Sequence, residues 1–450
     1  MTTTTALTAN QILRQGGLIL TSVLLAKSNI GTENIGNFET LSYVTTALSF
    51  FWLTSITQTS LSFLSDLSPA DKKNASISIF TLLFVIAFLF FGTSILFNTQ
   101  ILSWLTKRTY VPFFNWFALS QIFILPTFVA ENILTVDNRP KQIVRFGVLS
   151  YIVPVFIFLL PIWIGRYPIL LPLSLRDFNF LELSYIGLFI YSVFRFLYVV
   201  FFILEIRFRI SDNPKYEIQN PKSEMRAFVG LCVPMLGYFF LNQFSTVFIN
   251  GWVCAFAPDK PEIFAQFRYG AREFPLVSAL VAGLSNSYVP MLASGKATLN
   301  DLKKKSAQTA HIIFPISILL LLSSKFLFPL VFNPAFSASV PVFNIYVLLV
   351  MSRAIFPQTV LLSLKDTRTL LYVSVLETLF IVITCTFLLN QFGPIGAAWS
   401  VVTGFLLEKI LLAMALRRFH NISFDNYTPV KIYSGYCCLI LGFYVLSLRF

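Results

Sequence analysis

The feature that most constrains this chain is a series of thirteen apolar stretches, each long enough to cross a lipid bilayer as a helix. In lipid, every backbone N–H and C=O group must be bonded within the protein, so such stretches become membrane-spanning helices. Charged residues make up only 12% of the 450 residues, about half the share in a soluble domain. We therefore expect an all-α polytopic membrane protein. The expected spans are 11–26, 40–64, 75–97, 112–134, 143–165, 183–206, 226–250, 263–290, 308–331, 339–363, 369–389, 393–416 and 431–448.

The basic residues between the spans predict the orientation, because cytoplasmic loops retain Lys and Arg. If the N-terminus is cytoplasmic, 20 of the 33 Lys and Arg residues lie in the loops or at the span ends on that side and 7 lie on the other side. We therefore expect a cytoplasmic N-terminus, with Arg14 near the cytoplasmic surface. The net charge of +13 has the same origin, since each basic residue near an anionic inner leaflet gains about 1 kcal/mol, and it does not indicate nucleic-acid binding.

One long polar connection divides the chain. Residues 207–225 contain Pro214 and Pro221 and join the sixth and seventh spans, as a linker between two six-helix halves would. Since both halves begin on the same side of the membrane, they would be parallel repeats related by an axis along the membrane normal. We expect an N-terminal lobe at 1–206, a cytoplasmic linker at 207–225, a C-terminal lobe at 226–418, and a loop with an additional transmembrane helix at 419–450.

A short sequence similarity between the two halves favours an internal duplication. The loop after the fourth span reads D-N-R at 137–139, and the loop after the tenth reads D-T-R at 366–368. Each follows a span that contains a proline, Pro126 or Pro357. The alternative interpretation is that D-x-R is simply a common short turn.

Several basic residues lie inside the expected spans, where a central arginine costs about 2.5 to 3.5 kcal/mol unless water, protein or substrate offsets it. Arg195, Arg272 and Arg353 lie near mid-depth, and Arg268 shares a helix face with Arg272. For Arg268 the alternative role is to extend to the outer interface. For the three deep arginines the alternative is a structural ion pair with an acid inside the spans: Glu273, Glu377 or Glu408.

Acids and one of the two lysines inside the spans complete the charges considered for the site. Glu408 and Lys409 are adjacent and point to different faces of a helix, so we expect them to need separate partners. Glu273 and Glu377 are candidates for binding a coupling proton or cation. The excess of cations over acids favours an anionic substrate, because guanidinium groups bind phosphate oxygens in bidentate geometry. Two histidines and five cysteines lack the spacing of a metal site or a disulfide framework, so we expect no metal and no cofactor.

Two motifs resemble those of a known family. Residues 30–38, IGTENIGNF, resemble the LG-x-x-x-(F/Y)-G pattern after the first helix of polysaccharide flippases in the multidrug/oligosaccharidyl-lipid/polysaccharide (MOP) exporter superfamily. Residues 390–400, NQFGPIGAAWS, are similar to the entry of that family into its twelfth span. The chain thus resembles a Wzx-type O-antigen flippase over nearly its whole length. The thirteenth span departs from the usual twelve or fourteen.

The resemblance implies two six-helix lobes around a central cavity, a fold of the MOP/MATE type that opens alternately to each side of a bacterial inner (plasma) membrane. It implies the flipping of a polyprenyl-diphosphate-linked oligosaccharide to the outer leaflet for surface polysaccharide biosynthesis, with no enzymatic step. Together with the charges, it assigns the diphosphate to Arg272 and Arg268, supporting contacts to Arg353 and Arg195, and the cytoplasmic entrance to Arg14. Membrane lipids are the other expected partners, and a proton or sodium ion is expected to drive the cycle.

Two other functions remain open. A membrane-embedded glycan polymerase or ligase would use the same lipid-linked substrate, but such enzymes usually carry a large outer loop. No outer loop here exceeds about 20 residues, which is within the range of simple connections. A drug or cation antiporter of the same superfamily would favour acids over arginines in its cavity.

Overall fold

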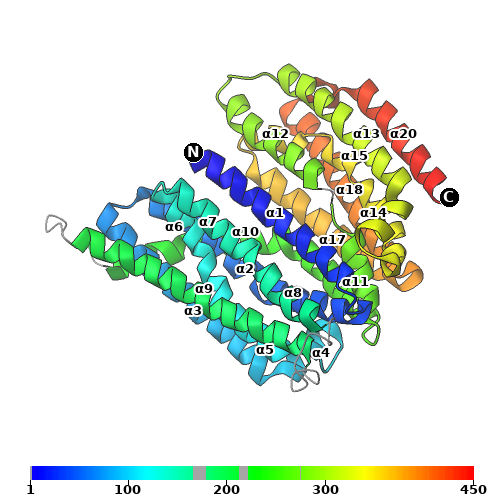
Figure 1. Ribbon diagram of the computed structural model, residues 1–450. Helices are drawn as coiled ribbons and strands as arrows, with labels where there is room; N and C mark the ends of the chain where they lie inside the picture. Colours follow the sequence, from blue (N-terminus) through cyan, green and yellow to red (C-terminus); the bar gives the residue numbers. More distant parts are fainter. Residues whose placement is uncertain (1–2, 166–178, 212–220, 274, 450) are drawn as a thin grey trace. The chain divides into compact units, whose positions relative to one another are not determined.

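The structure is a computed structural model that describes residues 3–165, 179–211, 221–273 and 275–449, and every regular element within them is a helix (Figure 1). The helices form two compact units, Met1–Gln243 and Phe244–Phe450, and the division falls inside α10 (Pro221–Phe256). The predicted all-α class is confirmed. The predicted domain limits stay a prediction, and residues 212–220 of the expected linker lie outside the described residues.

In the first unit, prolines break two of the expected spans into shorter helices. The fourth span passes through a 3-10 turn that contains Pro126, and the fifth is broken at Ile152, just before Pro154. Proline removes a backbone N–H from the helical ladder and is tolerated at the start of a helix, so both breaks follow from the sequence. The elements are α1 (Thr3–Lys27), α2 (Thr32–Asp66), α3 (Pro69–Leu96), α4 (Asn98–Thr106), α5 (Phe114–Ile124), η1 (Leu125–Phe128), α6 (Val129–Val136), α7 (Pro140–Tyr151), α8 (Val153–Gly165) and α9 (Phe180–Ser211).

In the second unit, the eighth and tenth expected spans are broken in the same way. One is interrupted ahead of Pro275, and the other ahead of Pro357. The elements after α10 are α11 (Pro261–Gly270), α12 (Pro275–Ala293), α13 (Leu299–Val331), η4 (Pro334–Ser339), α14 (Val340–Val347), α15 (Val350–Arg353), α16 (Pro357–Ser363), α17 (Thr367–Phe392), α18 (Pro394–His420), α19 (Phe424–Tyr427) and α20 (Val430–Ser447).

Helical segments occupy all thirteen expected spans. In the described residues, nine of these are long and apolar enough to cross a membrane, or ten if the bent α10 is counted as one span. These nine include α20, the additional C-terminal helix. The helices α1 and α2 are not among the nine because they are rich in Thr, Ser, Asn and Gln. The eighth span is also not among them, because it is divided between α11 and α12. The protein is a multi-pass membrane protein, and crossing by α1 and α2 stays a prediction.

Four helix ends in the first unit each have a counterpart in the second unit, and each pair is separated by the same number of residues along the sequence. The turn after α6 and the turn after α16 also share their backbone geometry, with Asn138 and Lys365 in the left-handed region at φ 52° and 60°. By this correspondence Asp366 aligns with Arg139, so the two D-x-R triplets are two residues out of register. The pairs of helix ends at the constant interval are Asp66 and Ala293, Val136 and Ser363, Pro140 and Thr367, and Gly165 and Phe392.

The aspartates of these two turns have opposite electrostatic environments. Asp366 lies 2.9 Å from His420 Nε2, and this hydrogen bond, with those from Thr369, holds the pKa of Asp366 below its usual range. Burial raises the pKa of Asp137, and Arg139 at 3.7 Å only partly opposes that effect. The two turns therefore share a backbone shape but differ in their electrostatics.

Glycines allow α17 and α18 to pack as a close antiparallel pair. Gly393, at φ 60°, caps α18 directly after α17 ends. A Cβ atom on Gly396 would lie 2.0 Å from the carbonyl oxygen of Leu388, and one on Gly404 would lie 2.3 Å from Ile381. The small-residue motif at 390–400 therefore acts through helix contact, as its composition predicts.

Candidate functional site

The break in the eighth span carries two charged residues. Residues 271–273 connect α11 to α12 without helical structure, so Arg272 and Glu273 project from an irregular backbone. The end of α11 is held close to η4, since a Cβ atom on Gly270 would lie 2.6 Å from the Ser339 carbonyl oxygen. The sequence therefore places an acid and a base where the helix is interrupted.

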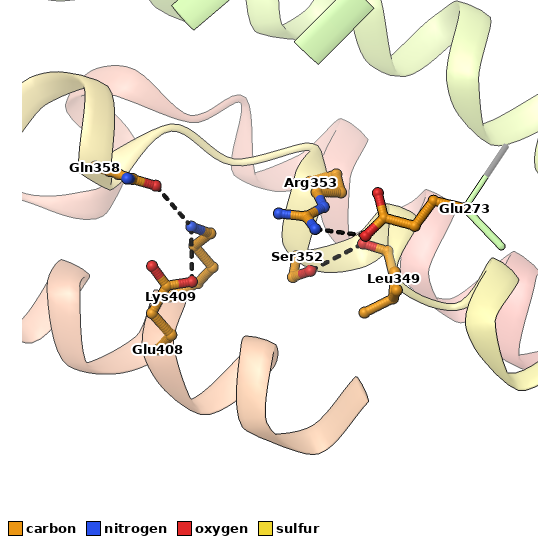
Figure 2. Close-up of polar contacts among 7 residues, drawn as sticks. All are labelled: Glu273, Leu349, Ser352, Arg353, Gln358, Glu408 and Lys409. Atoms are coloured by element: carbon orange, nitrogen blue, oxygen red, sulfur yellow. Dashed lines mark hydrogen bonds and ion pairs between the residues drawn. The ribbon is translucent and has the colours of Figure 1, made fainter. Parts of the chain in front are cut away.

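A second break, in the tenth span, brings the partner of Glu273. Arg353 is the last residue of α15, and residues 354–356 separate it from α16. Its Nη2 atom lies 2.5 Å from Glu273 Oε1, and the two side chains are 25% and 29% exposed (Figure 2). Irregular backbone at membrane depth is tolerated only where it is buried in protein or lines a water-filled cavity. An ion pair that joins two helix breaks is therefore a candidate site.

Aromatic rings and one amide contact the three arginines near the two helix breaks. The guanidinium of Arg272 lies 4.9 Å from the centre of the Tyr269 ring, and that of Arg353 lies 4.7 Å from Phe405. Arg268 donates to Asn250 Oδ1 at 3.3 Å, so it is bonded to α10. These contacts help to orient the guanidinium groups, and Arg353 in addition pairs with the Glu273 carboxylate.

A small pocket lies beside the ion pair. Arg272, Glu273 and Arg353 line it together with Ser317 and Tyr346. Its volume of about 20 Å³ is enough for about one water molecule. The pocket carries two cations and one carboxylate, which gives it a net positive charge.

A second charged cluster lies on α16, α17 and α18. Lys409 Nζ lies 2.9 Å from Glu408 Oε2 and donates to Gln358 Oε1 at 3.4 Å (Figure 2). Glu377 is 8% exposed and lies within electrostatic range of Glu408, Lys409 and Arg353. Three acids and two bases of the second unit therefore interact across the two clusters: Glu273, Glu377, Glu408, Arg353 and Lys409.

The expectation that Glu408 and Lys409 need separate partners was wrong. Adjacent side chains leave a helix in different directions, but the lysine side chain is long and flexible enough to reach its neighbour. Their side chains are only 10% and 6% exposed, and an unpaired charge there would be costly. Burial therefore overrides the simple rule of helical spacing.

Arg195 lies in the first unit and is almost fully buried, with 2% exposure. Its guanidinium carbon lies 5.2 Å from the ring centres of both Phe128 and Phe146. Within the described residues, its Nε and Nη2 atoms have no hydrogen-bond partner. In this conformation the two aromatic rings offset the cost of its burial.

The predicted site residues thus fall into two groups. Arg14 and Arg195 belong to the first unit, where Arg14 is exposed on α1. The second unit brings together the remaining ones, and their role in substrate or ion binding stays a prediction: Arg268, Arg272, Arg353, Glu273 and Glu377. The sequence analysis did not identify Gln358 or the aromatic partners, because their contacts are made between helices distant in the chain.

The fold and the charged helix breaks define a polytopic membrane protein with an ionised interior, and solved structures show which fold this is. No protein-family model matches the chain, and no curated protein matches it. The chain is similar to lipid II flippase MurJ in an inward closed conformation, at 17% identity and a TM-score of 0.69, over 99% of this chain and 92% of that one.

Two multidrug transporters are also similar in structure. One is an inward-facing MATE family transporter of the MOP superfamily, at 12% identity and a TM-score of 0.63, over 93% of this chain and 98% of that one. The other is the MATE multidrug transporter DinF-BH, at 16% identity and a TM-score of 0.55, over 92% and 94%. The chain therefore has the fold of MOP/MATE transporters, and the fold predicted from its motifs is confirmed.

Proposed function

We propose that this protein is a flippase that moves a polyprenyl-diphosphate-linked oligosaccharide from the cytoplasmic to the outer leaflet by alternating access. The observation that carries the proposal is the cationic pocket at two helix breaks, with Arg272 and Arg353 on its wall. In transporters, interrupted membrane helices are the usual place of substrate and ion sites. One of the similar structures is a lipid II flippase, and its name states a lipid-linked cargo for that protein.

The charges of the pocket favour a diphosphate over a cationic drug. Arg268, Arg272 and Arg353 outnumber the single acid Glu273 in this part of the second unit. Arg353 also keeps an unused donor, because its Nε atom has no hydrogen-bond partner in the described residues. Guanidinium groups match phosphate oxygens in bidentate geometry, so this site suits a phosphate headgroup.

The ion pair between Arg353 and Glu273 supplies a way to couple binding to movement. In the conformation described, the Glu273 carboxylate is paired with the Arg353 guanidinium, to which a phosphate would have to bind. A diphosphate would displace this carboxylate and release the link between the two helix breaks. A ligand shifts a conformational equilibrium only by its different affinity for the two states, and this exchange of partners provides such a difference.

Glu377 is the better candidate for a coupling proton. Glu273 has an arginine partner, whereas Glu377 has no hydrogen bond or ion pair within the described residues and lies near a second acid, Glu408. With Arg272, which lines the same pocket as Glu273, the two clusters hold three acids and three bases. A proton on Glu377 would remove its repulsion with Glu408, and the gain and loss of this proton would drive the cycle.

The remaining assignments are part of the same proposal. Arg195 supports the headgroup after a rearrangement that frees it from its aromatic neighbours, and Arg14 lies at the cytoplasmic entrance. The substrate serves surface polysaccharide biosynthesis, and the protein lies in a bacterial inner membrane with its N-terminus in the cytoplasm. The basic loops counted in the sequence support that orientation.

The test is transport by Arg272→Ala in proteoliposomes loaded with a fluorescent polyprenyl-diphosphate oligosaccharide. We expect loss of flipping with normal membrane abundance, partial activity in Arg272→Lys, and full activity in Arg449→Gln, a control outside the site. Unchanged flipping in Arg272→Ala would contradict the proposal.

A drug antiporter is the second candidate, because two of the similar structures are multidrug transporters. Uptake of a cationic dye by the same proteoliposomes, driven by a proton gradient and insensitive to Arg272→Ala, would favour the antiporter. Extension of the glycan chain in these vesicles would instead favour a polymerase.

A further inference from the structure

A groove opens between α18 and α20, and Lys409 of the second charged cluster lines its inner end. The helices are antiparallel and meet at one end, where the rings of Trp399 and Tyr444 are 5.6 Å apart and perpendicular. Toward the other end, α20 packs on α13 instead (Figure 1). The rings of Phe314 on α13 and Tyr436 on α20 are stacked there, with their centres 4.9 Å apart. The two helices therefore diverge, and a groove of about 680 Å³ lies in the wedge between them.

One face of α18 forms the floor of this groove. Leu406, Ile410, Met414 and Arg417 recur at intervals of three or four residues, as residues on one helix face do. Val430 and Tyr433 at the start of α20 line the opposite wall. Ile410, Met414 and Val430 are 56%, 61% and 40% exposed, so the apolar wall is open to the bilayer.

The polarity changes along the groove. Its wall is mainly apolar with Lys409 at the inner end, and its rim carries the exposed Arg417 in the last turn of α18. The first turn of α20 begins at the same rim, and the free N–H groups of a helix N-terminus favour a negative charge. Asp425 is the acid among the described lining residues, and the lining bases Arg417 and Lys409 outnumber it. The described lining therefore carries a net positive charge.

The length of the apolar face matches one leaflet. From Leu406 to Arg417, α18 rises about 16 Å, at 1.5 Å per residue. Half of a hydrocarbon core of about 30 Å is about 15 Å. A single acyl chain of that leaflet would extend along the face while its phosphate reached Arg417.

We propose that this groove binds one anionic phospholipid of the leaflet in which Arg417 lies. The phosphate contacts Arg417 and the first turn of α20, and one acyl chain fills the wedge against Ile410 and Met414. This lipid attaches the last helix to α18. It also keeps water from Lys409, which lines the inner end of the groove and is 5% exposed. The proposal is independent of the transported cargo.

Native mass spectrometry of the purified protein tests the site, with phosphatidylglycerol and phosphatidylcholine as probes. We expect one tightly held phosphatidylglycerol, and about fivefold weaker binding in Arg417→Gln, since one basic residue near the headgroup contributes about that much. Arg418→Gln is the matched control, because Arg418 is the exposed neighbour that does not line the groove. Its affinity should stay within about twofold of the original. Equal weakening by the two substitutions would overturn the proposal in favour of diffuse surface attraction.

A second variant tests the apolar part of the groove. Ala413→Trp fills the wedge and should displace the bound lipid, while helical content and elution volume stay normal. Retention of phosphatidylglycerol by both Ala413→Trp and Arg417→Gln would contradict the site. Displacement of phosphatidylglycerol by a polyprenyl phosphate at lower concentration would assign the groove to the transported lipid instead.

Discussion

Each unit has a buried cation at the same distance from the start of a helix, and the cost of its burial is offset differently in the two units. Arg195 follows the first residue of α9, Phe180, by the same number of residues as Lys409 follows the first residue of α18, Pro394. Both are buried, at 2% and 5% exposure. Arg195 lies between two aromatic rings, whereas Lys409 pairs with Glu408 and a neighbouring amide.

The difference shows two ways to keep a charge out of water. Aromatic rings attract a cation through a fixed charge distribution, which does not titrate. A carboxylate gives a stronger attraction, but its charge depends on protonation and on what else approaches. Chemistry that responds to ions is therefore expected in the second unit, where Glu377 and Glu408 lie near Lys409. The cation of the first unit is expected to be less responsive.

The largest expected effect is that of Lys409→Met. This substitution leaves Glu408 buried without its cation, which should lower the free energy of unfolding by about 3–5 kcal/mol. Thermal or denaturant unfolding in detergent, followed by tryptophan fluorescence, measures the change. The double variant Glu408→Gln/Lys409→Met should recover most of the loss, and failure to recover would mean that the two residues do not act as a pair.

The pair at the helix breaks should be weaker than the Lys409 pair. Glu273→Gln should lower the free energy of unfolding by about 1–2 kcal/mol, because this pair is about a quarter exposed and so lies between the surface and buried limits. A double-mutant cycle with Arg353→Met gives the coupling energy from the same unfolding experiment. A coupling near zero would show that the pair is not formed in solution.

Arg195→Met should change the stability by less than about 1 kcal/mol in either direction. Loss of the two cation–π contacts is opposed by removal of donors that have no partner in the described residues. The same unfolding measurement compares it directly with Lys409→Met. A loss as large as that of Lys409→Met would show that the two cations are equivalent. Flipping by Arg195→Met then tests its predicted role at the headgroup.

The smallest effect is expected in the matched turns. His420→Ala removes the main group that lowers the pKa of Asp366, and should reduce stability by less than about 1 kcal/mol. Because that pKa is lower in the folded protein, the contribution is present above the ordinary value of 3.8 and is lost as the pH falls through the folded pKa. Unfolding between pH 3 and 7 measures it. A pH-independent difference would contradict this account.

Asp137→Asn, in the corresponding turn of the first unit, should have the opposite sign. Burial raises the pKa of Asp137, so its ionised form is disfavoured in the folded protein near neutral pH. The amide should therefore be slightly stabilising at pH 7 and lose that advantage as the pH falls. A destabilised Asp137→Asn at pH 7 would show that Arg139 outweighs the burial.

Much of the fold could be predicted, and less of the site. The apolar stretches predicted where helices form, since hydropathy and length are local properties of the chain. An ion pair was among the alternatives for Arg353, but its partner Glu273 is eighty positions away, and spacing alone does not select it from the other acids. The aromatic neighbours of Arg195 were missed for the same reason, because Phe128 and Phe146 lie on other helices.

The sequence by itself determined that this protein crosses the membrane many times as helices, because lipid offers no partner for an unbonded backbone group. Prolines in the sequence also lie beside four of the helix breaks, although other prolines stand inside continuous helices. Only the tertiary structure decided how each buried charge is offset, by a ring, an amide or a carboxylate. Burial makes each of these charges costly, and the groups that offset the cost come mainly from helices that are distant in the sequence and adjacent only after folding.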